Sequence, residues 1–343
     1  MPSPHAARLL IAIAIGLATA SCGGDAGNTA TTPGAPTSVG PTTTIPLPVT
    51  TTLPAPSTTV EQGFTRLEAD WVLDSEMIDL SMPSGLAVNS QDRIFVLDAG
   101  NSRVIEIDAE GKVIREWSET GSGPGQFDSF GFGFVAVDGD DNLFVVDNGN
   151  HRVQKLGPDG EYLTAFGAEG AGHGQFERAI GVAVDPVGNV YVTDDAKPVV
   201  QVFDNDGSFL YSFGEPGDDD GQFQHPTGIA IAPDGHVYVS DYETKKVQKF
   251  TGEGEFVLAW TMGAPGGTPE GVAIGPDGNV YVADYSLARI ERFSPDGRPI
   301  DQLGTRGLQP GEFITPVGIA FDSNGRMLVT DQRRNTVQAL EIP

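Results

Sequence analysis

The chain has 343 residues, and its 47 acidic and 20 basic side chains give a formal net charge of −27. This charge argues against a nucleic-acid-binding protein, because affinity for phosphate backbones comes largely from cationic side chains. The 45 glycines and 25 prolines indicate many turns and exclude a fold made mainly of long helices. The single cysteine excludes an intrachain disulfide bond and a cysteine-rich zinc site.

Residues 1–22 have the pattern of an export signal. Arg8 precedes an apolar run from Leu9 to Ala20, which is too short to span a bilayer as a helix. The segment from Leu17 to Cys22 resembles a bacterial lipobox, and this resemblance implies that Cys22 is acylated after cleavage. We therefore expect export and a lipid anchor on the outer face of the cell membrane. A secreted protein with an ordinary signal peptide is the alternative.

Residues 23–63 are predicted to form a disordered stalk. Between residues 26 and 60 the chain carries no charge and is dominated by threonine and proline. This composition favours an extended chain that buries no core. We expect the lipid anchor to be the only attachment of the folded part, residues 64–343, to the membrane.

From residue 82 onward the chain repeats a short apolar run that ends in aspartate. The six copies end at Asp98, Asp147, Asp194, Asp241, Asp284 and Asp331. The intervals of 43 to 49 residues each have room for four strands, with glycine, aspartate and proline turns between them. Six such sheets packed radially form a β-propeller, so we predict an all-β fold with six blades.

The N-terminal end of this region contains the strand that its last copy lacks. The sixth copy ends after its third predicted strand, Val337–Leu340, and has no fourth. The segment Leu67–Trp71, which precedes the first copy, matches the fourth strand of that copy, Val113–Trp117. We therefore expect a strand from the N-terminal side of the domain to close the ring.

The copies share further residues around the aspartate run. Gln175–Phe176 is followed by Gly181–Asp185 and Gly188–Val192, and Asn150–Gln154 stands in the preceding copy. These motifs resemble the NHL repeat over about residues 64 to 343, although the second copy has Phe134 where the other copies have glycine. The resemblance implies a six-bladed propeller of NHL type.

Ligands of propellers bind on the face where the loops between second and third strands surround the channel. Our candidate ligand-binding residues on that face are Arg178, His225, Tyr242, Glu270, Tyr285 and Arg333. Arginine presents a planar array of donors, which suits an anionic or sugar-like ligand. The six repeated aspartates are expected instead to fix their loops by accepting backbone hydrogen bonds. The resemblance further implies that Arg103, Arg152 and Arg289 bridge neighbouring blades.

Two functional hypotheses remain. Peptidyl-hydroxyglycine lyases, which resemble this repeat, hold zinc with three histidines, and other six-bladed relatives use a divalent metal for lactone hydrolysis or ring opening. After the signal the chain has His151, His173, His225 and His236, of which His225 and, less securely, His151 are expected near the channel mouth. Two histidines near the channel mouth are one fewer than a three-histidine zinc site requires.

We assign no catalytic residue and no cofactor, but a divalent metal held by His225 and Glu270 stays open. The favoured hypothesis is a surface-anchored binding, sensor or scaffold module for a protein, peptide or cell-wall glycan. A metal-dependent lyase or lactonase is the alternative.

Overall fold

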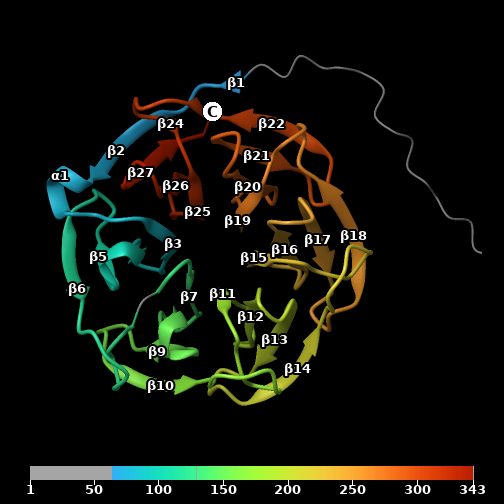
Figure 1. Ribbon diagram of the computed structural model, residues 1–343. Helices are drawn as coiled ribbons and strands as arrows, with labels where there is room; N and C mark the ends of the chain where they lie inside the picture. The colour runs from blue at the N-terminus through green and yellow to red at the C-terminus, as the bar shows by residue number, and fades with distance from the viewer. Residues whose placement is uncertain (1–63, 129, 343) are drawn as a thin grey trace, which may run out of the picture. The chain divides into compact units, whose positions relative to one another are not determined.

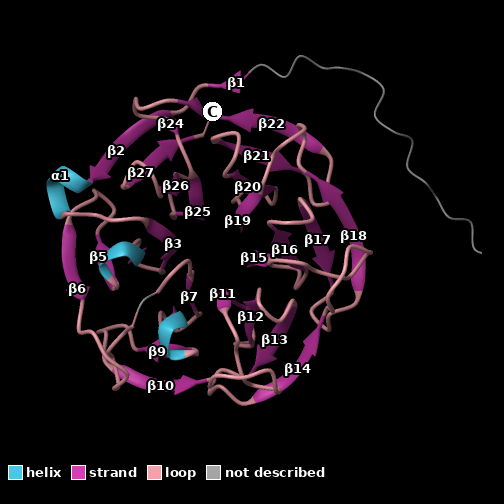
Figure 2. Cartoon of the chain, in the orientation of Figure 1, coloured by secondary structure: helices cyan, strands magenta, loops and turns pink. Residues whose placement is uncertain are grey.

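The computed structural model describes residues 64–128 and 130–342 of the chain. The predicted signal peptide, Cys22 and the stalk lie outside these residues. The described part contains six radial sheets around a central axis, five with four strands and one with five (Figure 1). Figure 2 shows that helix is confined to a few short segments. No helix of the described part is long and apolar enough to cross a membrane.

Each blade is an antiparallel sheet whose strands run in chain order from the central axis to the rim. Blade 1 consists of β3 (Pro83–Val88), β4 (Ile94–Asp98), β5 (Arg103–Ile107) and β6 (Val113–Trp117). Blade 2 consists of β7 (Val135–Val137), β8 (Leu143–Asp147), β9 (Arg152–Leu156) and β10 (Tyr162–Phe166). Blade 3 consists of β11 (Ala179–Val184), β12 (Val190–Asp194), β13 (Val199–Phe203) and β14 (Phe209–Phe213).

The second half of the ring follows the same order. Blade 4 consists of β15 (Pro226–Ile231), β16 (Val237–Asp241), β17 (Lys246–Phe250) and β18 (Phe256–Thr261). Blade 5 consists of β19 (Pro269–Ile274), β20 (Val280–Asp284), β21 (Arg289–Phe293) and β22 (Pro299–Leu303). Blade 6 contains β25 (Pro316–Phe321), β26 (Met327–Asp331) and β27 (Thr336–Glu341). The short elements between blades are α1 (Ser75–Ile78), β23 (Thr305–Arg306) and β24 (Glu312–Phe313), whereas η1 (Ala99–Asn101) and η2 (Asn148–Asn150) connect the second and third strands of blades 1 and 2.

The fourth strand of blade 6 comes from the other end of the domain. Strand β2 (Glu68–Asp74) pairs antiparallel with β27, with Leu73 opposite Val337. The preceding strand β1 (Phe64–Thr65) pairs parallel with β22 of blade 5. The start of the described chain is therefore joined by backbone hydrogen bonds to two blades, as the neighbouring blue and red ribbons of Figure 1 show.

The position of a strand within its blade explains its sequence pattern. All five residues of the second strand are buried in each blade, for example in β4 and β12, because a second strand is covered on both faces by neighbouring sheets. The outer strand β6 instead alternates between half-buried and exposed residues. The six apolar runs of the sequence are thus the radially packed centres of the blades.

Glycine near the start of the inner strands allows neighbouring blades to approach each other. A Cβ atom at Gly271 of β19 would lie 2.1 Å from the carbonyl oxygen of Val317 in β25. In blade 2 the corresponding residue is Phe134. Gly85 of β3 packs against the backbone of Phe134, and a Cβ atom at residue 85 would lie 2.3 Å from the Cα atom of Phe134. The departure in the second copy is therefore accommodated by the glycine of the preceding blade.

The repeated aspartates have the structural role predicted from the sequence. All six are fully buried at the ends of second strands. Asp194 accepts hydrogen bonds from the amides of Glu177 (2.8 Å) and Arg178 (2.9 Å), and Asp241 accepts one from the amide of Gln224 (2.7 Å). Each of these carboxylates fixes the entry of an inner strand to its own blade.

The three arginines that follow these aspartates are not equivalent. Arg152 pairs with Asp147 (Nε to Oδ2, 2.7 Å) and donates to the carbonyl of Gln126 (2.9 Å), in the connector that arrives from blade 1. Arg103 similarly donates to the carbonyl of Ile78 (2.6 Å), which precedes β3.

Arg289 contradicts the prediction that it bridges blades. Its guanidinium donates to Glu291 and to Gln302 (2.8 Å), which both belong to blade 5. The connector before blade 5, residues 262–268, has no Gln-Phe pair such as Gln126–Phe127 or Gln175–Phe176. Because Glu291 takes the place of the glutamines Gln154, Gln201, Gln248 and Gln338 of other third strands, it attracts the guanidinium into its own blade.

Candidate functional site

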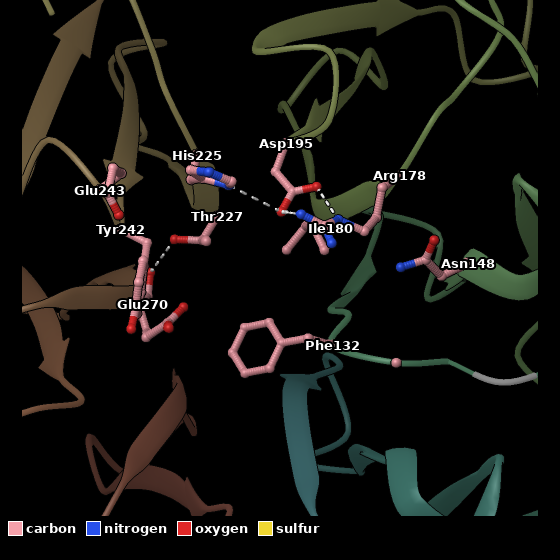
Figure 3. Close-up of a pocket in the computed structure, with 11 residues that line it drawn as sticks. Phe132, Asn148, Arg178, Ile180, Asp195, His225, Thr227, Tyr242, Glu243 and Glu270 are labelled. Atoms are coloured by element: carbon pink, nitrogen blue, oxygen red, sulfur yellow. Dashed lines mark hydrogen bonds and ion pairs between the residues drawn. The ribbon is translucent and has the colours of Figure 1, made fainter.

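A pocket of about 380 Å³ opens where the inner strands of blades 3, 4 and 5 begin (Figure 3). We call it the channel-mouth pocket. Its lining residues are Gly131, Phe132, Asn148, Arg178, Ile180, Asp195, His225, Thr227, Tyr242, Glu243 and Glu270. Further along the same inner strands, Val182, Ile229 and Val272 are among the apolar residues that line the channel itself. The pocket therefore has charged groups around its entrance and apolar residues beyond it.

Strand register sets the depth of each side chain in the pocket. Ala179, Pro226 and Pro269 lie opposite the terminal aspartates of their blades, so the three strands begin in the same register. Arg178 and His225 stand immediately before these residues, whereas Glu270 stands immediately after Pro269. Glu270 is thus equivalent to Ile180 and Thr227, two positions further along the strand than Arg178 and His225.

Arg178 and Asp195 form a double hydrogen bond at the entrance. Nε of Arg178 lies 2.5 Å from Oδ1 of Asp195, and Nη2 lies 2.7 Å from Oδ2. This hydrogen bonding raises the pKa of Arg178 above its usual value. Nδ1 of His225 lies 3.7 Å from Oδ2 of Asp195, so the carboxylate joins two blades (Figure 3). Because Arg178 is already paired, it is not the free anion-binding group that the sequence suggested.

Glu270 is the most deeply buried ionisable group of the pocket, with 4% of its surface exposed. Its backbone carbonyl accepts hydrogen bonds from the hydroxyl groups of Thr227 (3.4 Å) and Ser240. Its carboxyl oxygen Oε2, in contrast, is buried without a hydrogen-bond partner. Burial raises the pKa of Glu270 to about 8, with a smaller increase from Asp195, against the opposing charge of Lys245.

Two aromatic side chains form walls of the pocket. Phe132 packs edge-on against Phe134 with ring centroids 5.9 Å apart, and Figure 3 shows its ring beside Glu270, with an edge on that side. The amide of Tyr242 donates to the carbonyl of His225 (3.0 Å), which fixes the loop after β16 beside the strand entry. Burial and, next, the charge of Glu270 raise the pKa of Tyr242.

Four of the six candidate residues predicted from the sequence line this one pocket: Arg178, His225, Tyr242 and Glu270. Tyr285 and Arg333 lie outside its lining. The amide of Tyr285 donates to Thr268 (3.0 Å) and its side chain packs against a core cluster that includes Val317. Arg333 is exposed, and its amide donates to Oγ1 of Thr315 (2.9 Å).

Asp195 and Glu243 are charged lining residues of the pocket that are not among the six candidate residues, and Asp195 is the one that pairs with a candidate. It directly follows the repeated Asp194, and its amide donates to the carbonyl of Arg178 (3.1 Å). Tyr242 and His225 form the same pair in blade 4. The residue after a repeated aspartate therefore lies beside the residue that precedes the inner strand of the same blade. From this rule the sequence could have predicted that Asp195 lies next to Arg178.

The other three histidines lie away from the pocket, as the sequence predicted for His173 and His236. His151 ends η2 with a positive φ of 52°, His173 stacks on Phe209 with ring centroids 4.8 Å apart, and His236 pairs with Asp234 (2.9 Å). Residues 64–128 and 130–342 contain no group of three or more His, Cys, Asp or Glu side chains placed to hold a metal ion. Since Arg178 binds both oxygens of Asp195, this pocket does not supply a three-ligand metal centre.

The NHL repeat family matches residues 80–106, 133–156 and 223–250. No curated protein matches the sequence. Among solved structures, a gluconolactonase from Xanthomonas campestris has a TM-score of 0.62 at 18% identity, over 82% of this chain and 96% of that one. A streptogramin B lyase has a TM-score of 0.58 at 13% identity, over 80% of this chain and 98% of that one.

A catalytically inactive virginiamycin B lyase from Staphylococcus aureus, with quinupristin, also has a TM-score of 0.58 at 13% identity, over 80% of this chain and 99% of that one. At these identities the likeness concerns the fold alone. The matched repeats and the six radial sheets identify the chain as an NHL-repeat β-propeller with six blades.

Proposed function

We propose that the chain is a binding module that takes a small organic group in the channel-mouth pocket. The observation that carries this proposal is the buried, unpartnered Oε2 of Glu270 in a pocket of about 380 Å³. A buried polar atom without a partner costs about 1–3 kcal/mol, which a ligand group that pairs with it recovers. The volume suits one small molecule, one side chain of a peptide or one sugar of a glycan, since ligand pockets start at about 300 Å³.

Export and membrane attachment through Cys22 are part of the same proposal, because they place the pocket where envelope peptides and glycans are found. Acylation of Cys22 would supply an apolar anchor for the acidic domain. Metabolic labelling with a fatty acid and membrane fractionation test it. We expect Cys22→Ala to lose both the label and the membrane-bound fraction, and an unchanged membrane fraction would overturn the anchor.

Binding is tested by adding a panel of pocket-sized neutral, cationic and anionic compounds to the protein and measuring the shift in unfolding temperature. The variants are Phe132→Ala and Glu270→Gln, and Arg333→Gln is the matched control outside the pocket. We expect at least one class of compound to stabilise the wild type and the control, and to stabilise both pocket variants less. Equal shifts in all four proteins, or none in any, would overturn the proposal.

A second candidate is acid–base catalysis, as in the alternative of a lyase or lactonase. It is favoured by the raised pKa of Glu270, about 8, because a general acid works best when its pKa lies near the working pH. Similar structures include a gluconolactonase and a streptogramin B lyase, so gluconolactone and a streptogramin B compound are the first substrates to test. Turnover that Glu270→Gln abolishes in a folded protein, with and without added divalent metal, would establish catalysis.

A further inference from the structure

We infer that the ligand of the channel-mouth pocket carries an organic ammonium group that pairs with the carboxyl group of Glu270. The inference rests on the proposed ligand pocket and specifies the chemistry of its ligand. It is carried by the charges of the lining residues, by the free oxygen of Glu270 and by the aromatic walls.

The charges of the pocket favour a cation. Its acidic lining residues are Asp195, Glu243 and Glu270, and its basic lining residue is Arg178. Asp195 neutralises Arg178 through two hydrogen bonds, so Glu243 is left as an excess negative group, and Glu270 adds a second negative charge once its carboxyl group loses its proton. The net charge of −27 adds a long-range field that attracts cations and repels anions.

The chain itself does not supply a cation to Glu270. Lys245 is the basic residue whose charge reaches this carboxyl group. Its Nζ atom, however, donates to the carbonyl of Tyr242 and lies 4.3 Å from the centroid of the Tyr242 ring. Within residues 64–128 and 130–342, Oε2 of Glu270 has no hydrogen-bond partner. Oε2 of Glu270 therefore receives no donor from the described chain, and a ligand donor that reaches it would satisfy it.

The walls fit the remainder of such a ligand. Phe132, Ile180 and Tyr242 contribute apolar surface to the pocket. The faces of aromatic rings attract ammonium groups, most strongly where water is excluded. An amine on a compact apolar body makes both kinds of contact, whereas a carboxylate makes neither.

Binding of the ammonium group changes the protonation of Glu270. In the free protein the pKa of Glu270 is about 8, and Asp195 and Lys245 are the charged groups that act on it, next to His225, Tyr242 and Glu243 of the same pocket. At pH 7 the ligand ammonium therefore displaces the proton of the carboxyl group, which passes to the solvent, and an ion pair forms. The affinity should rise about tenfold from pH 6 to pH 7 and level off above pH 8.

The experiment is calorimetric titration of the protein with benzylamine, benzyl alcohol and benzoate, at pH 6, 7 and 8.5 and in two buffers of different ionisation enthalpy. Nα-acetyl-lysine amide and glucosamine serve as additional probes that distinguish a peptide side chain from an amino sugar. We expect benzylamine to bind more tightly than benzyl alcohol at pH 8.5 and to release nearly one proton at pH 7. Benzoate should bind most weakly.

Glu270→Gln keeps the shape of the side chain and should remove the preference for the amine together with its pH dependence, whereas Arg333→Gln should keep both. Circular dichroism checks that both variants are folded. If benzyl alcohol binds as tightly as benzylamine at every pH, the ligand pocket stands and the ammonium inference fails. If no probe binds, the proposed function fails with it.

Discussion

The repeated aspartates and the residues that begin the inner strands lie side by side in the fold, but only the first set is the same in every blade. All six aspartates are buried at equivalent places. The residues at the position of Glu270 in the six blades are Ser84, Gly133, Ile180, Thr227, Glu270 and Val317. The repeated aspartates maintain the ring. The residues at the position of Glu270 vary, so one sector of the channel mouth differs from the others in its side chains. Repetition therefore marks structural positions here, and its loss marks the candidate site.

The largest effect should follow from removing a repeated aspartate. Asp241 accepts hydrogen bonds from the amides of Gln224 (2.7 Å) and Thr244 (2.9 Å), among others. Asp241→Ala leaves these donors without a partner, and we expect it to lower the free energy of unfolding by about 4 kcal/mol. Urea denaturation measures the change. The control Asp220→Ala removes an exposed aspartate, and equal losses in the two variants would contradict the structural role.

A somewhat smaller loss is expected where blades approach around the channel. A Cβ at Gly271 would lie 2.1 Å from the carbonyl oxygen of Val317, so Gly271→Ala forces two backbones apart. We expect a loss of about 3 kcal/mol in the free energy of unfolding. Gly139→Ala is the matched control, because no atom lies within 4 Å of the added Cβ. If both substitutions have the same effect, the inner strands do not depend on this close approach.

Glu270 should behave in the opposite way from the aspartates, because Oε2 of its buried carboxyl group lacks a partner. Its pKa is raised from 4.5 to about 8, so the folded state binds a proton that the unfolded state has lost between these values. The wild type should therefore lose stability as the pH rises from about 5 to 8, relative to Glu270→Gln, which has no such proton.

We expect the free energy of unfolding of the wild type, relative to that of Glu270→Gln, to fall by about 3 kcal/mol between pH 5 and pH 8. Urea denaturation of both proteins at pH 5, 6.5 and 8 measures it, and the other acidic groups cancel because they are common to both. Parallel stability curves would show that the carboxyl group of Glu270 is solvated or paired.

The sequence predicts more of the ring than of the site, for a physical reason. Repeat spacing fixes the backbone position of a residue, so it correctly predicts the blades, the buried aspartates and the convergence of Arg178, His225 and Glu270. It does not predict which side chains meet within or between blades. The pairing of Arg178 with Asp195 and of Arg289 with Glu291 depends on such local contacts. The free oxygen of Glu270 likewise results from the placement of neighbouring hydroxyl groups and of Lys245.

The smallest effect on stability, and the sharpest test of charge in the pocket, should come from Asp195→Asn. About half of the Arg178 side chain is exposed, so losing its ion pair should lower the free energy of unfolding by less than about 1 kcal/mol. The substitution frees the guanidinium at the entrance, and it also removes a negative charge that raises the pKa of Glu270.

Asp195→Asn should therefore bind benzoate about tenfold more tightly than the wild type at pH 7, because an unpaired guanidinium binds carboxylates through two hydrogen bonds. Titration of both proteins with benzoate measures this change. The double variant Arg178→Gln with Asp195→Asn is the control, since it has the same net charge as the wild type but no guanidinium. If the double variant binds benzoate as tightly as Asp195→Asn does, Arg178 is not the group that Asp195 neutralises, and the selectivity of this sector has another source.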